Sequence, residues 1–347
     1  MTEQLGDGRI GYVQSRIRSD VMNRLFPADV SGALASDPRL DVDQHFVSIF
    51  VRASDGLSLH VRKYGFPAAS AVPVVCLPGL ARTAADFHVL AMALAADPAN
   101  PRLVLALDYR GHGQSQYDRN SNNYTIRFAL ADLSTILVAF EITSAIFIGT
   151  SFGGVLSMMG AVLPPAGAAG IILNDIGPVM EPRGLMRIKS WVGKLPTARN
   201  FEEGAEILRW LFKAQFTNLG PQDWVALAKR TWHHEHGTLV PSHDAKLARV
   251  LRGLSLERLP TLWDQFDALA RIPLMVIRGD NSDMLARPTL NEMIERRDQL
   301  EIVVVPDQGH APLLAESKVV RRIAWFVASC DRPGRRQEHR AADAGGA

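Results

Sequence analysis

The chain contains 347 residues, enough for one large domain with a smaller insertion or for two modest domains. Its 47% hydrophobic and 21% charged residues are ordinary for a globular protein with a sizeable core. The formal net charge of +2 lacks the basic excess that would indicate a nucleic-acid partner or binding to an acidic membrane surface. The 2 cysteines, Cys76 and Cys330, rule out a disulfide framework and fit a reducing compartment.

The two ends of the sequence differ from the rest in composition. Residues 1–44 form a polar extension whose first residues lack the apolar centre of a secretory signal. Residues 331–347 are charged or small, which predicts a disordered tail. No run approaches the roughly 18 consecutive apolar residues that span a bilayer. We therefore expect a cytoplasmic protein with no membrane span and no nucleic-acid partner. The sequence leaves its oligomeric state open.

The first regular elements are two strands. Residues 45–52 and 57–64 have strand patterns, and Ser54-Asp55-Gly56 between them predicts a hairpin turn. The pattern then changes to continuous apolar runs separated by segments of helical spacing, which is typical of parallel strands covered by helices on both faces. The apolar runs lie at residues 72–77, 102–107, 145–148 and 170–173, and the helical segments at 84–95, 125–140 and 151–161.

This alternation is interrupted once. Residues 178–270 are helix-like and contain five of the 6 tryptophans. The alternation resumes with apolar runs at 273–278 and 300–305 and a final helix at 317–329. The sequence therefore predicts an α/β core, residues 45–177 and 271–330, that is interrupted by a helical cap at residues 178–270.

A candidate nucleophile follows the apolar run at 145–148. The sequence Gly149-Thr150-Ser151-Phe152-Gly153 places a serine between a strand and a helix, with small residues on either side. A serine hydroxyl is a poor nucleophile until it is exposed and given a base, and a strained strand-to-helix turn exposes it. The alternative is an ordinary serine in a glycine-bounded turn. The flanking strand and helix favour Ser151 as a nucleophile.

A candidate base and acid follow two late strands. His310 comes just after the run ending at Val305, and the 9 other histidines lie elsewhere. The acid that orients it should come between the serine and the histidine in the chain. We favour Asp283, with Asp280 as a competing carboxylate or a turn and capping residue. Asp175 is a third candidate, with a structural role as its alternative.

Two backbone N–H groups are candidates for holding an oxyanion, which a tetrahedral intermediate requires. One belongs to Phe152, next to the serine. The other belongs to Leu80 in the turn Leu77-Pro78-Gly79-Leu80, where proline has no N–H to offer. Arg82 and Thr83 lie beside this turn and could touch a polar group of a substrate, although a solvated arginine is commoner.

Two further groups of residues invite other interpretations. The loop at residues 108–115 has repeated glycines but no P-loop Lys-Ser/Thr pair, so we interpret it as structural and His112 as not catalytic. The histidines near residue 235 match no standard zinc spacing. We therefore predict no metal and no cofactor. These histidines are His233, His234, His236 and His243.

Five sequence blocks together resemble the α/β-hydrolase superfamily over about residues 45–330. The resemblance implies an eight-stranded, mostly parallel sheet with helices on both faces and a helical lid after the sixth strand. It also implies Ser151, Asp283 and His310 as a catalytic triad, and it is closest to bacterial esterases, enol-lactonases and carbon–carbon bond hydrolases. One departure is Pro78-Gly79, where many relatives have His-Gly. The blocks are residues 77–80, 108–115, 149–154, 278–283 and 309–310.

The expected activity is hydrolysis of a carboxylic ester or lactone of a small, partly apolar substrate through an acyl-enzyme. Carbon–carbon bond hydrolysis or acyl transfer with the same triad is an alternative, and so is a receptor-like protein that binds a ligand with little turnover. Haloalkane dehalogenation is disfavoured, because it needs a carboxylate where Ser151 stands.

Overall fold

The computed structural model describes residues 45–68, 70–161, 167–252 and 259–331. The predicted extension at residues 1–44 and most of the predicted tail lie outside these ranges. Within them, no helix combines the length and the apolar character needed to cross a lipid bilayer.

The central sheet has 8 strands in the order β1-β2-β4-β3-β5-β6-β9-β10. The second strand runs antiparallel to both of its neighbours, and the remaining adjacent pairs are parallel. The predicted eight-stranded, mostly parallel sheet is therefore confirmed, as is the first hairpin. The strands are β1 (Val47–Arg52), β2 (Ser58–Tyr64), β3 (Val74–Leu77), β4 (Val104–Leu107), β5 (Ser144–Thr150), β6 (Gly167–Asn174), β9 (Leu274–Gly279) and β10 (Glu301–Val305).

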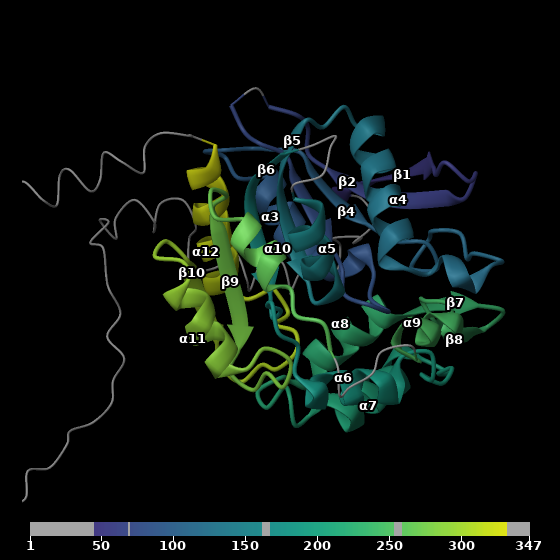
Figure 1. The fold of residues 1–347 in the computed structure, drawn as a ribbon. Coiled ribbons are helices and arrows are strands. Elements are labelled where there is room, and N and C mark those ends of the chain that lie inside the picture. The colour runs from purple at the N-terminus through teal and green to yellow at the C-terminus, as the bar shows by residue number, and fades with distance from the viewer. Residues whose placement is uncertain (1–44, 69, 162–166, 253–258, 332–347) are drawn as a thin grey trace, which may run out of the picture. The chain divides into compact units, whose positions relative to one another are not determined.

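Helices cover both faces of this sheet (Figure 1). Every residue of β3 and β4 is buried, because neither face of these central strands meets water. Helices α3 and α12 contact each other. Side chains of α4, α5 and α11 belong to the hydrophobic cores that also contain the strand residues. The helices are α3 (His88–Ala95), α4 (Ile126–Ala139), α5 (Phe152–Gly160), α11 (Arg287–Glu295) and α12 (Ser317–Cys330).

A largely helical segment, here called the insertion, separates β6 from β9 in the chain. Figure 1 shows most of its elements gathered beyond the carboxyl ends of the parallel strands. The aromatic side chains of Phe212, Trp224 and Trp232 form part of its own core, so these tryptophans pack as most buried ones do. Its elements are α6 (Pro182–Trp191), α7 (Phe201–Phe212), α8 (Pro221–Thr231), β7 (Trp232–Glu235), β8 (Thr238–Pro241), α9 (Ala248–Arg252) and α10 (Trp263–Ala268).

The insertion contains a hairpin, β7–β8, that the sequence did not lead us to expect. Its two turn residues, His236 and Gly237, have φ values of 46° and 84°. Positive φ at both central residues is the backbone geometry that lets two antiparallel strands meet in a tight turn. Three of the histidines considered as metal ligands thus belong to a short hairpin.

The boundary of the predicted tail needs a correction at Asp331. Its carboxylate bonds the guanidinium of Arg102 at 2.9 and 3.0 Å, and it accepts the backbone N–H of Val72 at 2.8 Å. The Arg102 side chain is only 1% exposed. A charge buried to this degree requires a partner. Asp331 therefore belongs to the folded core rather than to the tail.

The turn between β5 and α5 is strained and closely packed. Ser151 has φ 52° and ψ −114°, which confirms the predicted sharp turn. The backbone of Gly153, the second residue of the helix, lies against the carbonyl of Leu77 in β3, where any side chain would collide. Glycine at this position therefore lets the helix start close to the sheet.

Replacing Gly153 with alanine should destabilise the protein by about 1–3 kcal/mol, because the added methyl group forces the helix away from the Leu77 carbonyl. The melting temperature measures this loss. Gly167→Ala is the matched control, since a Cβ there meets nothing within 4 Å. Equal melting temperatures for the two variants would contradict the close approach.

A buried pair of histidines lies where the insertion meets the core. The backbones of His112 and His243 form an antiparallel bridge, and Gly113 donates its N–H to the Ser242 carbonyl at 2.8 Å. Burial lowers the pKa of His112 below its ordinary value. Burial, and then the nearby His112, lower the pKa of His243 to about 3. Both rings are therefore neutral in the folded protein at neutral pH.

Acidification should destabilise the protein through His243. The pKa of His243 is about 3 in the folded protein and 6.5 in the unfolded chain. Between these two pH values the unfolded chain binds a proton at this histidine and the folded protein does not. The free energy of unfolding should therefore fall as the pH is lowered from 7 to 5. In His243→Gln this fall should be smaller than in the wild type by about 1–2 kcal/mol. Denaturant unfolding at several pH values measures this. The exposed His234→Gln is the control, and parallel pH profiles for His243→Gln and the wild type would refute the assignment.

Candidate functional site

Three side chains from separate parts of the chain are joined by hydrogen bonds. Ser151 follows β5, and His310 lies in the loop after β10. The His310 Nε2 is 2.8 Å from the Ser151 Oγ, and its Nδ1 is 2.8 Å from the Asp175 Oδ2. The structure therefore brings the predicted serine and histidine together and adds a carboxylate to them.

The Asp175 carboxylate is fully buried and held by several donors. Asp175 directly follows β6, with φ 56°. Its Oδ1 accepts the Gly279 N–H at 2.8 Å, and its Oδ2 accepts the Ser282 hydroxyl at 2.6 Å in addition to the His310 ring. A carboxylate fixed in this way holds the histidine in one orientation, with the proton on Nδ1 and a free lone pair on Nε2 toward the serine.

The expected contact between Asp283 and His310 is absent, which corrects the acid proposed from the sequence. Asp283 instead forms a two-point ion pair with Arg187 of α6, at 2.7 Å for both hydrogen bonds. Burial raises the pKa of Asp283, but the Arg187 hydrogen bond and charge outweigh it and lower the pKa. The competing Asp280 lies at the surface, paired with Arg287 at 2.7 Å.

Chain order alone could not have chosen among these carboxylates, because all three lie between the serine and the histidine. The signal that favours Asp175 is its place at the carboxyl end of β6, the strand next to β5. Asp283 lies beyond β9, one strand further from the serine, and its arginine partner comes from the insertion, whose packing the sequence does not show.

The two predicted oxyanion donors belong to residues near Ser151: Phe152 is next to it in the chain, and Leu80 lines the same cavity. The Phe152 N–H is the first of α5, and the Leu80 N–H lies in the turn after β3. Neither N–H donates to another described residue. Free backbone N–H groups beside a serine are what an oxyanion requires.

A histidine that the sequence analysis set aside supports the Leu80 turn. Ala81, with φ 61°, donates its N–H to the His112 Nε2 at 3.1 Å. The His112 Nδ1 lies 3.0 Å from the Arg110 carbonyl, so Nδ1 carries the ring proton and Nε2 accepts. His112 thus positions the turn without touching Ser151. Only the three-dimensional structure brings it to this turn.

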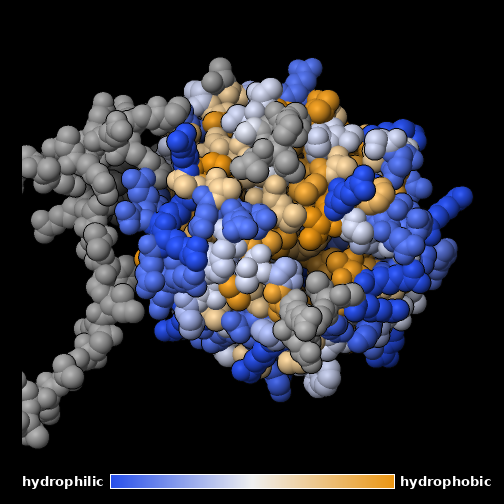
Figure 2. Space-filling view, in the orientation of Figure 1, coloured by the Kyte–Doolittle hydropathy of each residue, from blue (hydrophilic) through white to orange (hydrophobic). Residues whose placement is uncertain are grey.

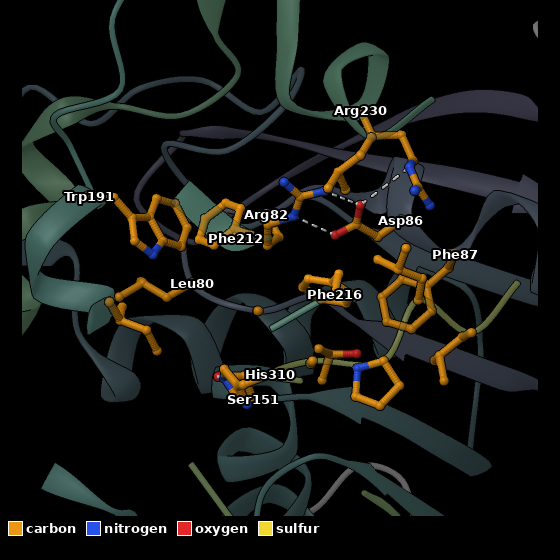
Figure 3. Close-up of a pocket in the computed structure, with 18 of the residues that line it drawn as sticks. Leu80, Arg82, Asp86, Phe87, Ser151, Trp191, Phe212, Phe216, Arg230 and His310 are labelled. Carbon is orange, nitrogen blue, oxygen red and sulfur yellow. Dashed lines mark hydrogen bonds and ion pairs between the residues drawn. The ribbon is translucent and has the colours of Figure 1, made fainter. Parts of the chain in front are cut away.

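Ser151 and His310 open into a cavity of about 110 Å³ that also reaches the insertion. Figure 3 shows Arg82, Asp86 and Arg230 across this cavity from the serine and histidine. Arg82 does line the cavity, as the sequence suggested it could, whereas Thr83 is buried beside it and caps a short helical turn.

A second, larger cavity of about 730 Å³ also reaches Ser151. Its walls are mostly apolar, and Figure 2 shows apolar side chains gathered around a hollow on this face. Leu80, Ser151 and Ile188 line both cavities, so the serine lies where the two meet. The apolar side chains of the larger cavity include Phe152, Val155, Met159, Ile176, Met180, Leu185, Leu251 and Met284.

The histidines considered as metal ligands do not assemble with other ligands into a metal site among the described residues. Among residues 45–331, leaving out the short undescribed gaps, no group of three or more His, Cys, Asp or Glu side chains is placed to hold a metal ion.

Comparisons with known proteins agree with this fold. A family model described as the alpha/beta hydrolase family matches residues 74–323. A 3-hydroxybutyrate-oligomer hydrolase of Cupriavidus necator is 32% identical over 278 residues, 77% of this chain and 92% of that protein. A 2-(acetamidomethylene)succinate hydrolase of Mesorhizobium japonicum is 25% identical over 81% of this chain and 92% of that protein.

A solved structure gives the same result. The crystal structure of an alpha/beta hydrolase from Novosphingobium aromaticivorans is similar to this chain with a TM-score of 0.76 and 35% identity. The match covers 82% of this chain and 98% of that one. The family match over most of the chain, the eight-stranded sheet and the similarity to named hydrolases show that the protein belongs to the α/β-hydrolase family and is a hydrolase.

Proposed function

We propose that the protein is a serine hydrolase that cleaves a carboxylic ester or lactone through an acyl-enzyme. The observation that carries this proposal is the chain of hydrogen bonds from Ser151 through His310 to Asp175, with both links at 2.8 Å. This arrangement gives the serine a base within proton-transfer distance and gives that base a fixed orientation.

The first half of the reaction forms the acyl-enzyme. The Ser151 Oγ attacks the carbonyl carbon while the His310 Nε2 takes the hydroxyl proton. The Leu80 and Phe152 N–H groups hold the oxygen that becomes negative. The His310 imidazolium then donates its proton to the leaving alkoxide, the carbon–oxygen bond breaks, and Asp175 stabilises the positive charge on the ring in between.

The second half consumes water. His310 takes a proton from a water molecule, which attacks the acyl carbon, and the same oxyanion donors hold the second tetrahedral intermediate. The proton returns to the Ser151 Oγ as the acid product leaves. The balanced reaction is ester plus water giving acid plus alcohol, and a lactone gives one hydroxy acid.

Two further observations support an ester with an apolar portion. The larger cavity at Ser151 is lined mostly by apolar side chains. The relative from Cupriavidus necator is named as a hydrolase of 3-hydroxybutyrate oligomers.

We also propose that residues 178–270 act as a cap over both cavities. Carbon–carbon bond hydrolysis and acyl transfer would use the same residues, and the products formed with and without an added alcohol acceptor separate these reactions from ester hydrolysis.

A fluorophosphonate probe should label the purified protein at Ser151, because an activated serine attacks the phosphorus centre. Mass mapping of the labelled peptide identifies the residue. Labelling should be lost in Ser151→Ala and His310→Ala, and hydrolysis of nitrophenyl butanoate should fall by about 10³-fold or more in both. Ser157→Ala is the control, because this serine of α5 is buried and bonded to the Gly153 carbonyl. An unlabelled folded wild type, or full activity in Ser151→Ala, would refute the proposal.

Asp175→Asn should lower kcat by about 10³- to 10⁴-fold with little change in KM, because an amide can favour the wrong His310 tautomer. Asp283→Asn should lower kcat far less, because it breaks the Arg187 ion pair and leaves the histidine's partner in place. Steady-state kinetics of both variants, with circular dichroism to verify folding, measure the difference. A larger kcat loss in Asp283→Asn would make Asp283 the acid.

A further inference from the structure

The cavity of about 110 Å³ at Ser151 and His310 is lined by three arginines, Arg82, Arg187 and Arg230. Arg187 is neutralised by Asp283, since its Nε and Nη2 each donate to one of the two carboxylate oxygens. The charge left in the cavity therefore depends on the other two arginines and the carboxylates beside them.

Each nitrogen of the Arg82 guanidinium donates a hydrogen bond. Its Nε and Nη2 donate to the two oxygens of Asp86 at 2.7 and 2.5 Å, and its Nη1 donates to the Thr231 hydroxyl at 2.7 Å. A two-point arginine–carboxylate pair of this kind satisfies the carboxylate. The charges of Arg82 and Asp86 therefore neutralise each other.

Arg230 of α8 is left with a charge that this pair does not neutralise. Its Nε donates to the Ala226 carbonyl of its own helix at 3.3 Å and lies 3.9 Å from the Asp86 Oδ1. Among the described residues, neither of its Nη groups has a hydrogen-bond partner. The nearby Asp223 is engaged at the start of α8, where it accepts the Gly220 N–H at 2.8 Å. Arg230 lines the cavity, and its two Nη groups are therefore guanidinium donors there without a partner among the described residues.

The Arg230 side chain is largely removed from water, since it is only 17% exposed. A guanidinium stays protonated under all ordinary conditions, and a charge taken out of water with most of its donors unsatisfied is costly. A bound anion would remove that cost. The planar pair of nitrogens suits the two oxygens of a carboxylate.

The position of His310 indicates which half of an ester would carry the anion. The leaving oxygen must lie within hydrogen-bond reach of the His310 Nε2 to receive its proton. His310 and the next residues, Ala311 to Leu314, line the arginine cavity, whereas the apolar cavity is lined by none of them. The leaving alcohol therefore lies on the arginine side, and the acyl group lies on the apolar side.

We propose that the substrate is an ester whose leaving alcohol is a short hydroxy acid, with its carboxylate bound by the Nη groups of Arg230 and an apolar acyl group in the larger cavity. This inference rests on the proposed ester hydrolysis. Figure 3 shows Arg230 across the cavity from Ser151 and His310, with Asp86 beside it. The cavity on the arginine side, about 110 Å³, is smaller than the apolar one, which favours a short hydroxy acid there.

The test compares two esters that differ only in charge. One is 3-(butanoyloxy)butanoate, and the other is its primary amide, 3-(butanoyloxy)butanamide. We expect kcat/KM of the wild type to be at least about tenfold higher for the acid, because a hydrogen bond between two charged groups is stronger than one to a neutral amide. In Arg230→Gln this preference should disappear, chiefly through a loss of at least about tenfold on the acid.

The matched control is Lys229→Gln, which removes a positive charge from the adjacent, exposed position of the same helix and outside the cavity lining. It should retain the wild-type preference for the acid. Free 3-hydroxybutyrate should also inhibit the wild type competitively, and at least about tenfold more weakly in Arg230→Gln. Melting temperatures of both variants show whether they fold.

The outcomes separate this inference from the proposed function. Equal kcat/KM values of the wild type for acid and amide, or an unchanged preference in Arg230→Gln, would overturn the anionic leaving group while ester hydrolysis stands. Hydrolysis of nitrophenyl butanoate without hydrolysis of either butanoyloxy ester would do the same. Failure on all three esters would overturn the proposed function itself, and this inference with it.

Discussion

The buried carboxylate of Asp175 is the point on which the geometry of the site depends. It accepts hydrogen bonds from three separate segments: the end of β9, the loop that follows it, and the loop after β10. A buried carboxylate is stable only when its oxygens are satisfied, so these segments cannot separate without leaving it unpaired. The orientation of His310 toward Ser151 is a consequence of that requirement.

Much of the fold and part of the site followed from local patterns. Continuous apolar runs predicted the strands, and their ends placed Ser151 and His310 on the same edge of the sheet. The acid was not predictable in this way, because Asp175, Asp280 and Asp283 all follow strands in the right order. Their partners decided among them: Arg187 neutralises Asp283, and this pairing depends on how the insertion packs against the core.

The insertion contributes side chains to the site. Helix α6 supplies Arg187, α8 supplies Arg230, and Gln215, which follows α7, accepts the His310 backbone N–H at 2.9 Å. Its sequence indicated helices but not which side chains would turn toward the serine. The β7–β8 hairpin was missed for a related reason, because its histidines carry no strand signal and its turn is visible only in the backbone.

The His112 segment connects the insertion to the turn that contains Leu80. Its backbone is bridged to His243 of the insertion, while its ring accepts the N–H of Ala81 beside the proposed oxyanion donor Leu80. An outward movement of the insertion at His243 would therefore pull on the segment that sets the oxyanion turn.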